Sequence, residues 1–345
     1  MNMKAAVFQG NRRVEIQERP IPAIGDGEVL LRVRASGICG SDVHGFEGKI
    51  PDRRPAGLVM GHEACGEVVE AGRGADRFKA GDRVAVNPLI PCGDCDACAH
   101  GWFHMCDAMV TFGSAVRVFH DGFMAEYAAV PQRQLSRLPD AVSFPEGAVV
   151  EPAGNATHLL NRVVLETGGS VAVFGAGTIG LLVIQASRMS GARQVIAVEP
   201  NPFRREMARS SGADLAVDPR AEDPVAAILS ATGGRGVDVA AETAGFAVTY
   251  RACLEVVRKR GKVAAFGFME PEVTFPLRRL IYREVAIIGC TAFTYEIETA
   301  LALMAGGRLN VRPLITHTFP LDRAQEAYET AADPGTKSIK VLVIP

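Results

Sequence analysis

Four of the eight cysteines of this chain lie in one short stretch, PCGDCDACAHGWFHMC (91–106). Cys92, Cys95, Cys98 and Cys106 follow the spacing C-x2-C-x2-C-x7-C, which lets four sulfurs reach one tetrahedral ion. A disulfide knot and an iron–sulfur cluster are the alternatives. Four sulfur ligands leave no open coordination position, so the spacing favours a structural zinc that holds a loop and takes no part in catalysis.

The size and composition of the chain argue against the disulfide alternative. Dense disulfides are typical of small secreted domains, whereas this chain has 345 residues and 48% hydrophobic content and can build a core without them. Its first residues, MNMKAAVFQGNRRVE, contain no apolar signal segment. We therefore expect a cytoplasmic protein whose thiols stay reduced.

The charge balance limits the kind of partner. The 37 Lys and Arg residues nearly match the 39 Asp and Glu residues, so no basic footprint for nucleic acid is expected. The longest apolar run, 171–186, is interrupted by glycines and is shorter than the roughly 20 residues that a bilayer requires. We expect a small-molecule substrate, no nucleic-acid partner and no membrane partner.

A second motif is typical of nucleotide binding. In SVAVFGAGTIGLLVIQASRM, Gly175, Gly177 and Gly180 form G-x-G-x-x-G between an apolar strand and a helical pattern, with Thr178 and Ile179 at the helix start. The first glycine allows the turn, the second lets the backbone approach a pyrophosphate, and the third packs helix on strand. The helix N-terminus then carries the anion.

An acidic residue follows this motif at the distance that favours NAD. Glu199 ends the next strand, 19 residues after Gly180, where a carboxylate binds the ribose hydroxyls and repels a 2′-phosphate. Arg204 and Arg205 follow closely and could pair with that phosphate, which keeps NADP open. An exposed acid at a strand end is the other interpretation of Glu199.

The elements that must position these residues fall into two regions. In the first, EVLLRVRAS (28–36) and similar runs alternate apolar and polar residues, which predicts half-buried strands. After Glu151-Pro152, six short apolar strands alternate with helical patterns, which predicts an α/β region with a parallel sheet of βαβ units, a dinucleotide-binding fold. The last residues, 318–345, are expected to form one helix and one strand that pack against the β-rich region.

Other candidate metal ligands lie in the first region. GICGSDVH (37–44) and GHEACGEV (61–68) supply Cys39, His62 and Glu63 at the ends of predicted strands. A thiolate and an imidazole bind catalytic zinc when three protein groups leave a fourth position to water or substrate. A cysteine at a strand end is also common in a core, and a His beside a Glu is common at a surface.

Five motifs occur in a characteristic order along the chain. They are CGSDVH, GHE, the four-cysteine loop, EPAGN (151–155) and GAGTIG (175–180). The chain resembles the zinc-dependent medium-chain dehydrogenases, the family of alcohol, polyol and threonine dehydrogenases. This resemblance implies a GroES-like β-rich catalytic domain, expected at 1–153 and 291–345, and a Rossmann NAD-binding domain, expected at 154–290. We further expect a homo-oligomer, a tetramer or a dimer.

The resemblance also implies roles for single residues. Cys39, His62 and Glu151 are similar to the family's catalytic zinc ligands, and Glu63 to a neighbouring carboxylate that can enter or leave coordination. With the four-cysteine site, this gives two zinc ions per chain. A carboxylate at Glu151, where alcohol dehydrogenases carry a cysteine, favours the polyol and threonine branch.

Two more residues, Ser41 and His44, resemble the family's proton relay through the cofactor ribose to solvent. In sorbitol-type enzymes an aromatic residue follows this histidine, and an arginine lies just after the last Rossmann strand. Here Gly45 follows His44, and GCTAFTYE (289–296) contains no arginine, which argues against sorbitol itself.

The expected activity is oxidation of a secondary alcohol of a polyol or sugar-derived substrate to a ketone, with hydride transfer to NAD. The Gly154-Asn155 pair is similar to threonine dehydrogenases and keeps L-threonine open. An acidic substrate such as an aldonate is favoured by a set of basic residues that we expect at the surface: Lys49, Arg53, Arg54, Arg117 and His120. The non-enzyme alternatives are a zinc-stabilised binding module and a catalytically silent, crystallin-like relative.

Overall fold

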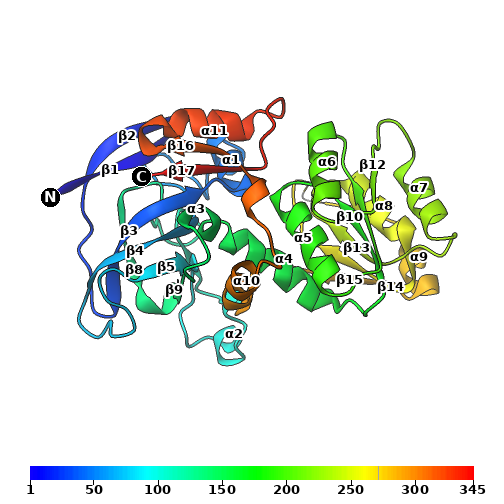
Figure 1. Cartoon of the computed structure of the whole chain (residues 1–345), viewed down its shortest axis with the longest axis horizontal. Helices are drawn as coiled ribbons and strands as arrows, with labels where there is room; N and C mark the ends of the chain where they lie inside the picture. Colours follow the sequence, from blue (N-terminus) through cyan, green and yellow to red (C-terminus); the bar gives the residue numbers. More distant parts are fainter. Residues whose placement is uncertain (271) are drawn as a thin grey trace. The chain divides into compact units, whose positions relative to one another are not determined.

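The computed structural model describes residues 1–270 and 272–345, and the chain divides into two compact units (Figure 1). Unit 1 comprises Met1–Glu151, Ile297–Gly307 and Val311–Pro345, and unit 2 comprises Pro152–Glu296 and Arg308–Asn310. The boundaries expected from the sequence fall after 153 and 290, whereas the chain divides after 151 and 296.

Unit 1 is built mainly from strands, in the order β16-β17-β3-β4-β5-β9 with β8 paired to β3. Along β3 the apolar residues Leu31, Val33 and Ala35 are buried and Arg32 is exposed, as the alternation predicts. The strands of this unit are β1 (Asn2–Gly10), β2 (Arg13–Pro20), β3 (Glu28–Gly37), β4 (Glu63–Ala71), β5 (Arg83–Val86), β6 (Leu89–Ile90), β7 (Val110–Thr111), β8 (Tyr127–Pro131), β9 (Leu135–Arg137), β16 (Ile315–Pro320) and β17 (Lys340–Ile344).

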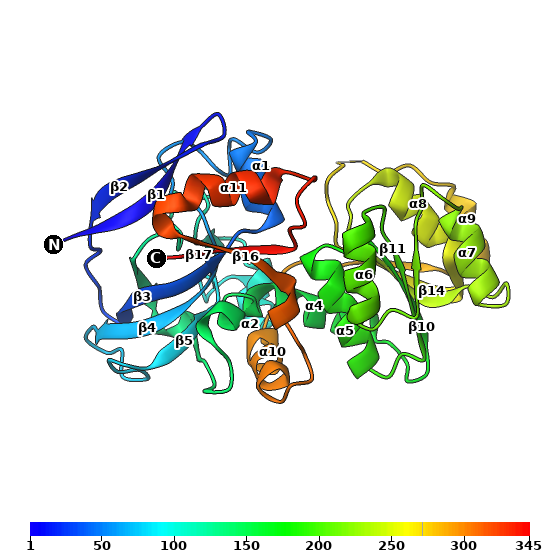
Figure 2. The same ribbon diagram turned by 45° about the horizontal axis from the view of Figure 1, so that its top comes forward.

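Short helices lie at the ends of these strands. They are α1 (Gly40–Phe46), α2 (Asp96–Ala99), α3 (Phe144–Gly147), α10 (Glu296–Ala305) and α11 (Ala324–Ala332). Helix α11 packs against β16, β17 and β2 in both views (Figures 1 and 2). The C-terminal segment thus supplies the expected helix and strand, and also β16, which pairs with β17 in parallel. Because β17 pairs with β3, the end of the chain completes the sheet that begins near its start.

Unit 2 contains one parallel sheet in the order β12-β11-β10-β13-β14-β15. Numbered along the chain, this is the order 3-2-1-4-5-6 of a doubly wound dinucleotide-binding fold. The strands are β10 (Ser170–Phe174), β11 (Gln194–Val198), β12 (Leu215–Val217), β13 (Val237–Glu242), β14 (Val257–Ala265) and β15 (Ala286–Gly289). The predicted α/β fold with a Rossmann sheet is therefore confirmed.

Helices cover both faces of this sheet. Figure 2 shows α5 and α6 on one face and α7, α8 and α9 on the other. The helices are α4 (Val150–Val163), α5 (Thr178–Met189), α6 (Pro202–Ser210), α7 (Pro224–Ala231), α8 (Ala247–Val256) and α9 (Leu277–Arg283). Since both faces are covered, strands such as β10 are buried along their whole length. Within the described residues, no helix combines the length and the apolar character that crossing a bilayer demands.

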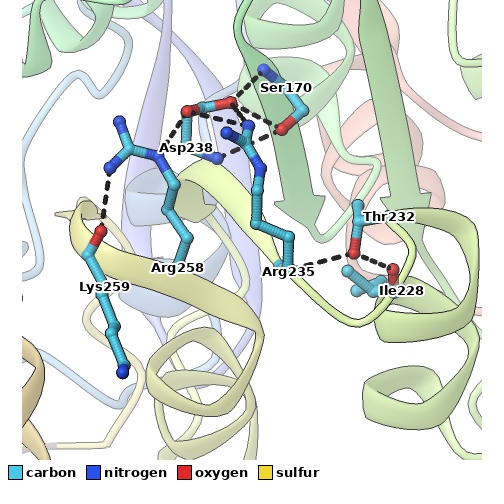
Figure 3. A network of polar contacts seen from close by, with 8 residues as sticks. Ser170, Ile228, Thr232, Arg235, Asp238, Arg258 and Lys259 are labelled. Atoms are coloured by element: carbon cyan, nitrogen blue, oxygen red, sulfur yellow. Dashed lines mark hydrogen bonds and ion pairs between the residues drawn. The ribbon is translucent and has the colours of Figure 1, made fainter.

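One carboxylate ties together the amino ends of three strands of this sheet (Figure 3). Asp238 in β13 accepts hydrogen bonds at 2.8 Å from both the backbone N–H and the hydroxyl of Ser170, which begins β10. It also pairs with Arg258 of β14 and, at 3.0 Å, with Arg235. This network fixes β10 at the end opposite the glycine motif, so it helps to hold the strand that presents that motif.

Replacing Asp238 with Asn should lower the free energy of unfolding of unit 2 by roughly 1–3 kcal/mol at pH 7, because a neutral amide loses its charge-assisted bonds. Although burial opposes it, hydrogen bonds from Arg258 and Ser170 hold the pKa of Asp238 at about 2. Since the unfolded value is about 3.9, the stabilisation should be complete above that pH and should be lost as the pH falls toward 2. Denaturant unfolding at pH 7 and pH 3 measures this difference.

Asp140→Asn serves as the control, since the Asp140 side chain is fully exposed, and it should change stability by less than about 0.5 kcal/mol. An Asp238→Asn protein as stable as this control at pH 7 would contradict the assigned role of the network.

Candidate functional site

The four-cysteine loop brings its sulfurs together. Strands β6 and β7 pair at its base, Cys95 is the N-cap of α2, and Cys98 lies within that helix. The sulfur of Cys92 lies 3.4 Å from that of Cys106 and 3.9 Å from that of Cys98, and all four sulfurs lie within 4.8 Å of one another.

This geometry fits a tetrahedral metal ion. Four sulfurs at about 2.3 Å from one ion are roughly 3.8 Å apart, close to the separations found here. All eight cysteines are free thiols, so the chain forms no disulfide within the described residues. Backbone N–H groups of Cys98 and Asp107 lower the pKa of Cys95 to about 7, which favours its thiolate. In contrast, a hydrogen bond with Asp94 raises the pKa of Cys92 to about 12, and burial raises the pKa of Cys98, so these two thiols would lose their protons as the metal binds. The donor set fits the predicted structural zinc.

A second cluster lies where β3 ends and β4 begins. Cys39 caps the start of α1, His62 precedes β4, and Glu63 begins β4 directly opposite Gly37 of β3. One ligand atom from each of Cys39, His62 and Glu63 lies within 4.8 Å of the others. A Cβ at Gly37 would lie 2.2 Å from Glu63 Oε2, so the glycine leaves the space that this carboxylate occupies.

The Glu63 carboxylate is held by a buried lysine. Lys340, the first residue of β17, places Nζ 2.7 and 2.6 Å from the two oxygens of Glu63 and 3.0 Å from the carbonyl oxygen of Ile38. Both side chains are almost fully buried. Although burial opposes it, Glu63 raises the pKa of Lys340, so the lysine stays charged. Glu63 therefore has a fixed position beside Cys39 and His62.

The imidazole of His62 faces a buried carboxylate. Asp42 Oδ2 lies 3.4 Å from His62 Nδ1 and accepts a hydrogen bond from the Cys39 backbone N–H at 3.1 Å. A carboxylate on one ring nitrogen orients a metal-binding histidine and raises its basicity. Burial lowers the pKa of His62, but Asp42 and Cys39 raise it well above its usual range, so this position favours positive charge. The donor set and its electrostatics both fit a zinc ion.

Glu151, also predicted as a ligand, is not part of this group. It is buried in the first turn of α4, whereas Glu63 is the carboxylate that lies with Cys39 and His62. The structure thus brings together three of the four predicted ligands.

The expectation that Arg54 belongs to a solvent-facing basic loop is wrong. Arg54 is only 5% exposed, and its guanidinium pairs with Asp42 at 3.2 Å. Lys49 is exposed but pairs with Glu47 at 2.8 Å. A buried guanidinium that is already paired cannot attract a substrate from solvent.

The relay candidates lie on helix α1. Ser41 Oγ accepts a hydrogen bond from Arg54 Nη2 at 3.4 Å, and His44 lies at the other end of the helix, where its side chain is 22% exposed. Burial and the nearby Lys49 ammonium lower the pKa of His44 below its usual range. A neutral imidazole with partial access to water can accept a proton near pH 7.

The glycine motif of unit 2 has the expected geometry. A Cβ at Gly180 would lie 1.9 Å from the Gly175 carbonyl oxygen, so the helix and the strand turn are in close contact there. Gly177, the N-cap of α5, has no atom within 4 Å of such a Cβ, so its backbone is open to a ligand. Thr178 and Ile179 form the first turn of α5, where the positive end of the helix dipole attracts an anion. This arrangement is suited to a pyrophosphate.

Glu199 is fixed beside this motif. Its two oxygens accept hydrogen bonds from the backbone N–H groups of Ala176, at 2.8 Å, and Asn201, at 2.9 Å. Arg205 pairs with Asp218 at 2.8 Å and donates to the carbonyls of Glu199 and Pro200.

Arg204 lies in the first turn of α6, where its backbone N–H donates to the side chain of Asn201. Arg205 is thus already paired with Asp218.

Sequence reasoning missed the residues that support the cluster, Asp42 and Lys340. Asp42 lies inside CGSDVH, a motif used only for its cysteine, serine and histidine. Lys340 lies in the apolar run KVLVI, and a charged residue in a buried strand signals a buried partner. The signals were present, but their partners are distant in sequence.

Comparison with known proteins agrees with these sites. Residues 25–140 match the alcohol dehydrogenase GroES-like domain, and residues 178–306 match the zinc-binding dehydrogenase domain. The chain is 34% identical to sorbitol dehydrogenase of Bacillus subtilis, over all of this chain and 98% of that protein. It is 38% identical to L-threonine 3-dehydrogenase of Pyrococcus horikoshii, over 91% of each chain.

A solved structure supports the same assignment. A zinc-binding dehydrogenase of Sinorhizobium meliloti, crystallised with NADP, superposes with a TM-score of 0.92 and 31% identity over the whole of both chains. The relatives match both units of this chain, and its residues form both a nucleotide motif and two clusters that fit zinc. The chain therefore belongs to the zinc-dependent medium-chain dehydrogenase family, as an alcohol or polyol dehydrogenase.

Proposed function

We propose that this enzyme oxidises a secondary alcohol of a polyol or sugar-derived substrate to a ketone and transfers the hydride to NAD. The observation that carries the proposal is the cluster of Cys39, His62 and Glu63. Three protein groups of mixed type leave a coordination position open, whereas four cysteines do not. The two clusters would thus hold a catalytic and a structural zinc, with Glu151 close to the catalytic one.

The chain's own residues would divide the work as follows. Zinc, when bound, supplies a Lewis acid that makes a coordinated hydroxyl group more acidic. Asp42 orients His62, and Lys340 fixes Glu63. The Ser41 hydroxyl would accept the substrate proton while it donates its own to the cofactor ribose, and His44 would take up the proton from the ribose and release it to water, since its lowered pKa favours release.

The preference for NAD rests on Glu199. Its carboxylate would accept hydrogen bonds from the ribose hydroxyls and would repel a 2′-phosphate. Arg205 is already paired with Asp218 and is not free to compensate. The Sinorhizobium meliloti relative was crystallised with NADP, so the preference of this chain for NAD needs a direct test.

The substrate class rests on the carboxylate-containing zinc site and on the relatives. Sorbitol and L-threonine dehydrogenases both act on a secondary alcohol flanked by a polar group. Arg54 is unavailable to an anionic substrate, which weakens the aldonate alternative. We rank a polyol first and L-threonine second.

We also propose a homo-oligomer. Strand β15 lies at the edge of the unit 2 sheet, where Ala286 and Ile287 are exposed, and Ile281 and Tyr282 of α9 are more exposed still. An exposed apolar strand edge of this kind offers unpaired backbone groups with which another chain can pair.

Metal analysis should find two zinc ions per chain. Alanine at Cys39 or His62 should remove one ion and lower kcat roughly 1,000-fold or more, because a Lewis acid contributes several kcal/mol to catalysis. The Kd of NAD should stay within about twofold, because the nucleotide residues lie in unit 2. Elemental analysis, steady-state kinetics and NAD titration measure the three quantities.

Cys95→Ser is the matched control, since it should also remove one ion but should lower thermal stability more than turnover per folded molecule. If this variant stays stable and loses turnover completely, the division of roles between the two clusters is wrong.

Glu199→Ser should lower kcat/KM for NAD by about 10–100-fold, the value of a lost hydrogen bond to a charged group, and should raise kcat/KM for NADP. Glu206→Ser, which removes an exposed acid of α6, should change neither. An NAD/NADP ratio that is the same in the Glu199 variant and in the wild type would mean that Glu199 does not read the ribose.

A screen of pentitols, hexitols, aldonates, L-threonine and ethanol, ranked by kcat/KM, tests the substrate class. We expect a polyol other than sorbitol to lead, and ethanol to be at least about tenfold poorer because it leaves polar groups of the site unpaired. L-threonine in first place would favour the alternative, and a clear lead for simple primary alcohols would refute the polyol assignment. A chain that holds two zinc ions but turns over nothing would be a silent relative.

A further inference from the structure

Arg54 is a buried arginine that contacts residues of helix α1. Its neighbour Arg53 is exposed, whereas the Arg54 guanidinium donates from Nε to Asp42 Oδ1 at 3.2 Å, from Nη2 to Ser41 Oγ at 3.4 Å and from Nη1 to the Arg53 carbonyl oxygen at 3.2 Å. Nη2 also lies 3.2 Å from Asp42 Oδ1 as an ion pair. A guanidinium is buried in this way only where fixed acceptors receive its donors. Arg54 is therefore committed to two adjacent residues of the CGSDVH segment.

Gly45 makes room for this arginine. A Cβ at Gly45 would lie 2.4 Å from Arg54 Cγ and 2.6 Å from Arg54 Cβ, too close for any side chain. Gly45 lies within α1 and is buried, so the glycine is needed for space. An aromatic residue at this position, as in sorbitol-type enzymes, has no room beside Arg54. Gly45, a departure from the sorbitol pattern, and the buried Arg54 thus depend on each other for space.

Arg54 is connected to the metal ligands through Asp42. Arg54 donates to Oδ1 of Asp42, while Oδ2 of the same carboxylate faces the Cys39 N–H and the His62 ring. Asp42 is completely buried and Arg54 nearly so, so the pair is shielded from bulk solvent. Removing the guanidinium would leave the buried Asp42 carboxylate, which faces the His62 ring, without its positively charged arginine partner.

We propose that Arg54 is a positioning residue that couples the zinc ligands to the proton relay, through Asp42 on one side and Ser41 on the other. The inference rests on the proposed function, since it takes Cys39 and His62 as zinc ligands and Ser41 as a relay group. It adds a residue that touches neither substrate nor metal, and it explains why this chain carries Gly45 after His44.

The test compares Arg54→Met, Arg54→Lys and a control, Arg83→Met, in the zinc-loaded enzyme. Arg83 is a partly buried arginine of the same unit that donates to the carbonyls of Pro139 and Val142. Zinc release to a coloured chelator is followed over time, and the release of the four-cysteine zinc is the internal reference. The values of kcat and of KM for NAD are measured in parallel.

We expect Arg54→Met to release one of the two zinc ions about 10–100-fold faster and to lose kcat by a similar factor, as for other residues that orient metal ligands. KM for NAD and release of the second ion should not change. Arg54→Lys should retain zinc better than Arg54→Met does, because its ammonium group keeps a positive charge beside Asp42. Its kcat should remain low, because a single ammonium does not reproduce the fork that also reaches Ser41.

Equal zinc release and equal kcat in Arg54→Met and Arg83→Met would overturn the inference and leave the proposed function intact. Should Arg54→Met fail to fold, zinc release and kcat of Arg54→Lys and Gly45→Ala test the inference instead. The added methyl group displaces the arginine, so wild-type zinc release and turnover in Gly45→Ala would also overturn it. A wild-type enzyme that holds zinc only at the four cysteines would refute the proposed function itself, and this inference with it.

Discussion

Charged groups can be buried only in pairs, and the metal-binding cluster of this enzyme is built on two such pairs. Lys340 neutralises Glu63, and Arg54 neutralises Asp42, with every member of both pairs at most 5% exposed. Breaking a buried pair leaves an uncompensated charge, which is strongly destabilising. The pairs therefore restrict the positions of Glu63 and His62 far more tightly than hydrogen bonds at a surface could.

These pairs also explain why unit 1 is discontinuous in sequence. Lys340 lies 277 residues after Glu63 and reaches it because β17 pairs with β3, the strand that leads to Cys39. The last strand of the chain thus supplies the lysine that holds the Glu63 carboxylate in place. The four-cysteine loop has the opposite character, since its ligands come from one continuous segment and depend on no distant strand.

The sequence predicted the features that are local. The spacing of Cys92 to Cys106, the Gly175 to Gly180 motif and the alternation along β3 each lie within one segment, and each has the expected form. Contacts between distant segments could not be inferred. A basic residue at position 54 is typical of a solvated loop, and only the fold brings it to Asp42 of α1.

The choice between Glu63 and Glu151 likewise depends on where β4 and α4 lie, which no spacing reveals. Glu63 was expected as a neighbouring carboxylate that can enter or leave coordination, and the fold places it with Cys39 and His62.

The central claim is that Cys39, His62 and Glu63 hold a catalytic zinc distinct from the four-cysteine ion. An anomalous difference map from crystals of the purified enzyme, recorded at the zinc absorption edge, tests it most directly. We expect two peaks per chain, one of them about 2.0–2.3 Å from the Cys39 sulfur, a His62 ring nitrogen and a Glu63 oxygen. A single peak at the four cysteines, with no anomalous density beside Cys39 and His62, would contradict it.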